Sequence, residues 1–161
     1  MAGLDTFAEV LDHPMYVVTT RAGDERAGCL VGFASQCSID PPLFMVWLSL
    51  ANRTYRVAHG ASHLAVHTLR PEQRATAELF GGRTGDDIDK FDRVEWWPGE
   101  DGVPVLSDCC AWFVGRVLER VDGGDHVGFL LAPVAESPSG PVRPPLLRLG
   151  DVVDLSPGHP A

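Results

Sequence analysis

Three adjacent polar residues, Asn52, Arg53 and Thr54, lie between the apolar run of residues 43–51 and a short helix predicted over residues 55–59. Backbone N–H groups at the start of a helix bind phosphate groups, and an arginine beside them adds a charge-assisted, forked hydrogen bond. The same residues also suit an ordinary helix cap next to a solvated arginine. The segment therefore indicates a phosphate-binding corner or, as the alternative, a capping motif without a ligand.

Histidine side chains are the other groups that could act on a ligand. His126 follows a Gly-Asp pair at the start of a predicted strand, where an imidazole is either a hydrogen-bonded structural group or a polar group beside a substrate. His59, His63 and His67 recur every fourth residue, which on one helix would form a metal-binding face. The alternation of residues 63–67 indicates a strand instead, on which only His63 and His67 share a side. Carboxylate and cysteine partners at ligand spacing are missing from this stretch, so we predict no metal site.

Composition narrows the classes of function. The chain has 161 residues, with 13 Lys+Arg against 22 Asp+Glu, and its formal net charge is −9. Such an acidic protein is unsuited to bind nucleic acid or an anionic membrane surface, although one local anion site is compatible with that charge. The start of the chain is acidic and lacks the apolar core of a signal peptide, and residues 43–51 are too few for a membrane-spanning helix. We therefore expect a cytoplasmic protein.

The elements that must position these residues are mostly strands. The 17 glycines and 13 prolines favour a turn-rich β protein. Residues 107–120 fit a helix or a strand by pattern alone, and the glycine within them and the Val-Asp-Gly-Gly-Asp sequence after them favour a hairpin strand. We predict helices over residues 4–11, 55–59 and 71–80, an acidic loop over 83–90, and strands over 15–20, 27–39, 43–50, 63–69, 94–97, 107–120, 126–135 and 146–149. This pattern predicts a small barrel of six or seven strands in one domain over residues 1–161, with a core of about residues 5–150 and a short tail.

An ordered set of short motifs along this pattern resembles a known family. The matching segments are residues 16–20 (YVVTT), 28–43, 52–55 (NRTY), 89–91 (DKF) with 94–96, 102–106 (GVPVL), 124–126 (GDH) and 145–147. Together they resemble the flavin reductase-like proteins of the FMN-binding split-barrel group over roughly residues 5–150. The resemblance implies a mainly β protein with short helices, folded as a Greek-key-like split barrel of six to seven strands, which assembles as a homodimer.

The resemblance also implies a role for each matching residue. The strand beside the flavin ring would bind it through Cys29, Leu30, Val31, Gly32, Ser35 and Gln36. The phosphate would be held by Ser49, Asn52, Arg53 and Thr54, and the pair Lys90 and Phe91 would reach toward the cofactor. His126 would lie near the nicotinamide as the catalytic residue. Three features depart from the family pattern: Leu30 stands where a threonine is common, Phe33-Ala34-Ser35 replaces Ser-Phe-Thr, and Leu131 and Ala132 are both apolar.

The implied activity is reduction of FMN or FAD by hydride transfer from NADH or NADPH, with the protein serving as the reductase component for a separate monooxygenase. Hydride transfer between two cofactors needs no side-chain nucleophile, which agrees with the lack of paired carboxylates or a Ser/His/Asp set at a recognisable spacing. Two alternatives stay open at this point. One is an oxidoreductase of the same fold that uses another flavin, such as the deazaflavin F420, and the other is a flavin-binding carrier without nicotinamide activity.

Overall fold

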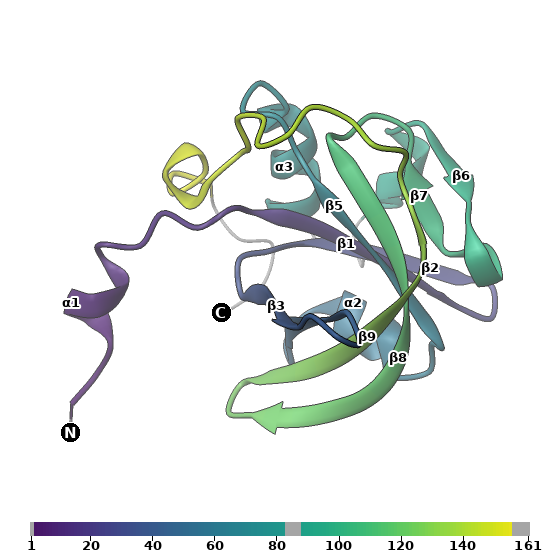
Figure 1. Ribbon diagram of the computed structural model, residues 1–161, viewed down its shortest axis with the longest axis horizontal. Helices are drawn as coiled ribbons and strands as arrows, with labels where there is room; N and C mark the ends of the chain where they lie inside the picture. Colours follow the sequence, from purple (N-terminus) through teal and green to yellow (C-terminus); the bar gives the residue numbers. More distant parts are fainter. Residues whose placement is uncertain (1, 83–87, 156–161) are drawn as a thin grey trace.

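A computed structural model describes residues 2–82 and 88–155 of the protein. Within these residues a seven-stranded antiparallel sheet has the strand order β2-β1-β5-β8-β9-β4-β3, and a separate two-stranded ribbon is formed by β6 and β7 (Figure 1). The strands are β1 Tyr16–Ala22, β2 Glu25–Val31, β3 Ala34–Ser38, β4 Leu43–Ser49, β5 His63–Thr68, β6 Trp96–Pro98, β7 Pro104–Leu106, β8 Ala111–Gly123 and β9 His126–Glu136. The α-helices are α1 Asp5–Ala8, α2 Arg53–Ala58 and α3 Arg74–Gly81, and single 3-10 turns cover Lys90–Asp92, Glu100–Gly102 and Leu149–Asp151.

Turn residues set the two hairpins that dominate the sheet. Gly23 has φ +60° between β1 and β2, and Gly124 has φ +79° between β8 and β9, a backbone conformation that favours glycine. The β8–β9 pair is long and its register shifts at two places, between Val114 and Gly115 and between Val117 and Glu119. Such bulges bend a strand pair and increase its twist. The bent hairpin can therefore pair with β5 through β8 and with β4 through β9.

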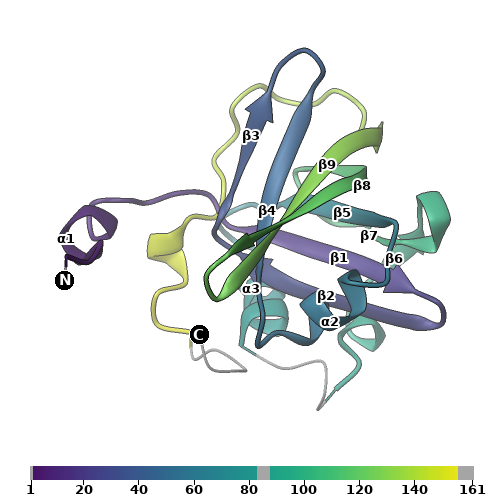
Figure 2. The same ribbon diagram turned by 90° about the horizontal axis from the view of Figure 1, so that it is seen from below.

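The sheet curls because its two edge strands are neighbours in the sequence. β2 lies at one edge and β3 at the other, yet only Gly32 and Phe33 separate them in the chain. The two edges therefore meet at this corner, and β1 and β2 run across the direction of β3 and β4 (Figure 2). Buried side chains from both halves fill the inside of the curl, among them Val18, Leu48, Leu64 and Phe129.

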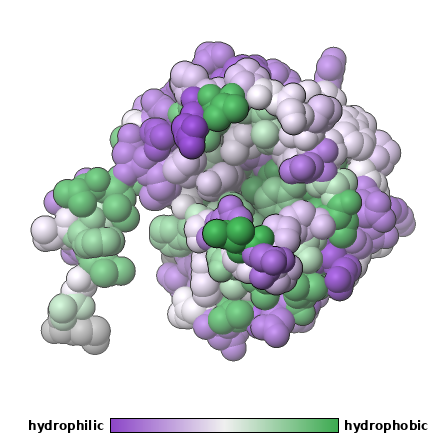
Figure 3. All heavy atoms as spheres, viewed as in Figure 1, coloured by the Kyte–Doolittle hydropathy of each residue, from purple (hydrophilic) through white to green (hydrophobic). Residues whose placement is uncertain are grey.

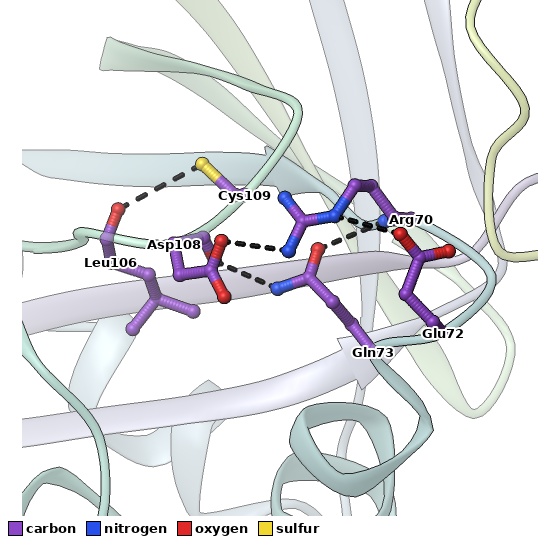
Figure 4. A network of polar contacts seen from close by, with 6 residues as sticks. All are labelled: Arg70, Glu72, Gln73, Leu106, Asp108 and Cys109. Carbon is purple, nitrogen blue, oxygen red and sulfur yellow. Dashed lines mark hydrogen bonds and ion pairs between the residues drawn. The ribbon is translucent and has the colours of Figure 1, made fainter.

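Helix α3 covers a second apolar cluster outside this curl, built around Phe80, Leu69 and Leu147. A polar network fixes the start of the helix to the loop before β8 (Figure 4). The Arg70 guanidinium lies 2.8 Å from an Asp108 carboxylate oxygen, and the Gln73 side chain donates to the Asp108 carbonyl at 3.0 Å. The Arg70 backbone N–H in turn donates to the Gln73 amide oxygen at 2.9 Å.

The mainly β architecture with short helices confirms the prediction, and three elements correct it. The strand predicted over 27–39 is divided, because the chain leaves one sheet edge at Gly32 and enters the other at Ala34. The strand predicted over 146–149 is wrong: among the described residues this segment makes one isolated bridge, Pro14 to Arg148, and then turns. The helix predicted over 4–11 is a single turn. Residues 83–87 of the predicted acidic loop lie outside the described residues.

No helix in the described part of the chain combines the length and the apolar character that crossing a membrane requires.

Candidate functional site

An open, largely apolar pocket of about 620 Å³ lies at the end of β2, where the chain leaves this edge of the sheet. Its walls come from the end of β2, from β4 and the start of β9, and from the chain segments at residues 8–15 and 149–155. The volume falls in the range of about 300–1,000 Å³ that is typical of ligand sites. Seven of the residues predicted for the site line it: Cys29, Leu30, Val31, Gly32, Ser49, Asn52 and His126.

The backbone of β2 presents polar groups along its free edge. The carbonyl of Arg26 accepts a hydrogen bond from the Arg53 guanidinium at 2.8 Å, and the carbonyl of Gly28 accepts one from Lys90 Nζ at 3.0 Å. Both carbonyls therefore point away from β1. Because alternate residues of an edge strand point the same way, the N–H and C=O of Leu30 also face outward, into the pocket that Leu30 lines. This gives an apolar pocket one polar backbone edge.

Glycines leave room for neighbouring side chains at the end of this edge. A Cβ built on Gly32 would lie 2.7 Å from His13 Cε1 and 3.3 Å from the Met15 sulfur. A Cβ on Gly81, at the end of α3, would lie 2.8 Å from a methyl carbon of Leu30. A side chain at Gly32 would therefore displace two residues that line the pocket.

The start of α2 forms the corner predicted for phosphate. Of the two residues suited to cap the helix, Asn52 and Thr54, it is Asn52 that does so, accepting the Thr54 N–H on its side-chain oxygen at 2.9 Å. Thr54 is buried beneath the corner, against Cys29. Burial raises the pKa of the Cys29 thiol, so the sulfur is protonated and acts as a small apolar group in the pocket wall.

The two cations of the predicted site lie toward a smaller polar pocket of about 220 Å³, farther along the edge of β2. Arg53 Nη2 is 3.4 Å from a Glu25 carboxylate oxygen. Lys90 is buried, its ammonium donates to the carbonyls of Gly28 and Phe80 at 3.0 Å each, and burial lowers its pKa to about 8. Phe91 also lines this pocket and packs edge-on to the ring of Phe80.

Two of the predicted ring-binding residues lie elsewhere. Ser35 and Gln36 are exposed on β3, and neither lines the large pocket. The Gln36 side chain donates to the Ser38 carbonyl at 3.0 Å.

His126 lines the pocket at the start of β9. Its Nδ1 lies 2.7 Å from an Asp125 carboxylate oxygen, and its ring centroid is 5.1 Å from that of Phe33. The imidazole holds the pKa of the Asp125 carboxyl below its usual value. Because that carboxylate is charged, it accepts a hydrogen bond from the Nδ1–H and thereby orients the ring.

Several pocket residues were not foreseen from the sequence. Trp47 and Phe33 lie beside His126, and the apolar side chains of Leu149, Val152 and Leu155 form the wall nearest the C-terminus. Strand alternation puts Trp47 on the same face as Ser49 and was a usable indication. Nothing in the local pattern marks the C-terminal segment, which is held by contacts distant in sequence, such as the Gly150 N–H donating to Asp12 at 2.8 Å.

The structure brings a serine, a histidine and an aspartate together away from the pocket. Ser62 Oγ lies 2.8 Å from His63 Nδ1 and donates to Asp101 at 2.6 Å. The hydroxyl proton is thus directed at the carboxylate and not at the imidazole. A serine nucleophile needs the opposite arrangement, so we interpret this cluster as a surface contact between β5 and the β6–β7 ribbon.

Comparison with known proteins gives this geometry a family. A family model described as the flavin reductase like domain matches residues 9–149. The chain belongs to the flavin reductase-like family. The match begins just after α1, ends at Leu149 and includes most of the residues that line the large pocket.

Relatives with named functions align with this chain over different lengths. A "Probable flavin reductase" of Rhizobium meliloti is 32% identical over 114 residues, which cover 68% of this chain and 36% of that protein. A reductase subunit of a flavin-dependent monooxygenase of Mycobacterium tuberculosis is 29% identical over 143 residues, 88% of this chain and 75% of the relative. An NADH:riboflavin 5'-phosphate oxidoreductase of Streptomyces pristinaespiralis is 31% identical over 145 residues, 89% of this chain and 80% of the relative. This chain thus spans about a third of the first relative and most of the other two.

A solved structure shares the fold. An FMN-binding protein of Thermus thermophilus, crystallised with bound p-hydroxybenzaldehyde, superposes with a TM-score of 0.81 at 25% identity. The superposition covers 91% of this chain and 85% of the other.

Proposed function

We propose that this protein is a flavin reductase that binds FMN and reduces it with a nicotinamide donor. The observation that carries the proposal is the free edge of β2, which presents the Leu30 backbone to an apolar pocket. A flavin ring is flat and apolar over its faces and polar along one edge, so this combination fits it. The relative named as an NADH:riboflavin 5'-phosphate oxidoreductase supports FMN and NADH as the pair.

The residues of the chain bind and orient, and the cofactor supplies the chemistry. When bound, flavin would supply the hydride acceptor and a dihydronicotinamide the hydride, so the chain itself needs no reacting side chain. Cys29, Leu30, Val31 and Gly32 would hold the ring, with outward backbone groups at its polar edge. Ser49, Asn52, Arg53 and Thr54 would hold the phosphate. His126, oriented by Asp125, would contact the nicotinamide and keep it against the flavin.

Four predicted residues contribute less directly in this proposal. Lys90 binds the carbonyl of Gly28 and so fixes the free edge of β2, while Phe91 packs edge-on to the Phe80 ring. Ser35 and Gln36 would not touch the ring and would affect its binding only indirectly, through the link between β2 and β3. These roles are open to substitution experiments at each position.

We infer a homodimeric assembly with a closed split barrel, one domain over residues 1–161 and a cytoplasmic location. Support for the dimer is the apolar surface of the N-terminal segment: Leu4, Phe7 and Val10 are each more than 60% exposed, and the segment stands off the body (Figure 3). The monooxygenase relative supports a separate monooxygenase as the consumer of the reduced flavin. Sedimentation equilibrium tests the dimer.

The proposed activity is tested by anaerobic titration. Adding FMN to the purified protein should shift the flavin absorption bands, and adding NADH or NADPH should then bleach them. No binding of either FMN or FAD would reject the proposal, and binding without bleaching by either nicotinamide would favour a flavin carrier or a deazaflavin enzyme. A productive titration with NADH alone would establish the donor.

Arg53→Ala tests the phosphate corner separately. Loss of a charge-assisted bond should weaken FMN binding by about tenfold and leave riboflavin, which has no phosphate, nearly unchanged. Arg56→Ala, an exposed arginine on the same helix, is the matched control. Equal losses for FMN and riboflavin would show that Arg53 acts only through its contacts with β2.

A further inference from the structure

Trp47 is held in a defined position in the wall of the large pocket. It lies on β4, it is partly buried, and its backbone N–H donates to the Phe33 carbonyl at 2.9 Å, so the link between β2 and β3 is tied to it. Its cross-strand partner on β9 is Gly128. Of the tryptophans at positions 47, 96, 97 and 112, all within the described residues, Trp47 alone lines the large pocket.

Two glycines admit the indole. A Cβ on Gly123 would lie 2.5 Å from Trp47 Cζ3, and a Cβ on Gly128 would lie 2.9 Å from the same atom. Neither glycine has a positive φ, so the backbone does not require glycine at these positions. The Trp47 indole requires glycine at both positions, because the ring lies directly against the backbone of the β8–β9 hairpin. An aromatic side chain seated in this way is a rigid surface.

The indole shares its face of the sheet with the groups proposed to meet the hydride donor. Trp47 and Ser49 are two residues apart on β4 and both line the pocket, and Ser49 is the cross-strand partner of His126. Phe33 adds a ring 5.1 Å from the imidazole. The ring-bearing part of this wall belongs to other strands than the β2 edge proposed for the flavin ring, so the pocket has a candidate surface for each of two flat rings.

We propose that Trp47 is a substrate-binding residue on which the nicotinamide ring of the donor stacks. The inference rests on the proposed function and specifies one of its surfaces. Aromatic rings attract one another in offset or edge-on contacts. The nicotinamide becomes a cation as it loses hydride, and the face of an indole attracts a cation more strongly than a phenyl ring or an alkyl group does. Trp47 therefore stabilises the developing charge as well as the bound ring.

The test compares Trp47→Phe and Trp47→Leu with the matched control Trp97→Leu, whose exposed indole lies outside this pocket. For Trp47→Leu we expect kcat/KM for NADH to fall about tenfold while the dissociation constant for FMN changes less than twofold. Trp47→Phe should lie between wild type and Trp47→Leu, and Trp97→Leu should match wild type. Nicotinamide mononucleotide added to the FMN-loaded protein should shift the indole N–H resonance of Trp47.

Other outcomes overturn the inference. If Trp47→Leu weakens FMN binding and leaves kcat/KM for NADH unchanged at saturating FMN, the indole is a flavin contact. If thermal stability falls but both constants are unchanged, the indole is structural. Gly128→Ala keeps the indole but displaces it, so this variant should also lower kcat/KM for NADH. An unchanged value would count against stacking of the nicotinamide on Trp47. Absence of flavin binding in the wild type would overturn the proposed function itself and this inference with it.

Discussion

The free energy of unfolding should decrease as the pH falls through a window set by the buried His67. This imidazole on β5 is completely buried, and it joins three strands: Nδ1 lies 2.9 Å from the Val17 carbonyl, and Nε2 accepts the Leu106 N–H at 3.0 Å. The first bond needs a proton on Nδ1 and the second needs a lone pair on Nε2, so the geometry holds the neutral ring. Burial lowers the pKa of His67 to about 4.

The sign and size of the effect follow from this pKa. In the unfolded chain the ring titrates near its ordinary value of 6.5, so between pH 6.5 and 4 the unfolded state binds more protons than the folded state. The free energy of unfolding is therefore full above pH 6.5 and decreases as the pH falls toward 4. From pH 7 to pH 4.5 the loss from this one residue is about 2 kcal/mol.

Urea denaturation at pH 7, 5.5 and 4.5 measures this loss, and His67→Gln removes it. Glutamine can keep an acceptor for the Leu106 N–H but cannot titrate, so the variant should be less stable at pH 7 and should lose less stability on acidification than wild type. His59→Gln, the same change at an exposed position, should keep the wild-type pH dependence. Parallel curves for wild type and His67→Gln would refute the assignment, because the proton uptake would then belong to other groups.

Two further substitutions test the packing described above. Gly32→Ala places a methyl group 2.7 Å from His13 Cε1 and should weaken flavin binding about tenfold in a fluorescence titration, whereas Gly140→Ala, with nothing within 4 Å, should not; equal affinities would show that the glycine does not shape the pocket. Arg120→Met removes the guanidinium that donates to the carbonyls at the end of α2 at 3.0–3.3 Å, and it should lower the free energy of unfolding by about 1 kcal/mol in urea. Arg120→Lys, which keeps the charge near the helix end, should recover part of that loss.

Local patterns were enough to predict most strands and the cap of α2. Asn52 has the residue type and position of a helix cap, and it caps. Gly124 supplies the positive φ that the β8–β9 turn needs. Both depend on neighbours in the sequence, which is why the pattern could show them. The same holds for β4 and β9, whose apolar runs are long enough to indicate buried strands.

The distribution of the predicted site residues between a large apolar pocket and a smaller polar pocket could not be predicted from the sequence. It depends on contacts between segments that are distant in the chain. The sequence pattern includes Lys90 in a motif, but only the fold shows that its ammonium binds the Gly28 carbonyl at the outer edge of β2. Residues 27–39 read as one strand since nothing at Gly32 signals a change of sheet edge. The wall formed by Leu149 and Val152 depends on the segment near His13, at the other end of the chain.

The pairing of β4 with β9 has a consequence for how the protein is made. On a ribosome the N-terminal half emerges with Trp47, Ser49 and Asn52 in place along the chain, but β4 receives its partner only after His126 and Gly128 have been synthesised. Until then one wall of the pocket has no strand to lie on. We therefore expect nascent chains that stop before β9 to be unable to hold flavin, so that acquisition of the cofactor reports a finished fold.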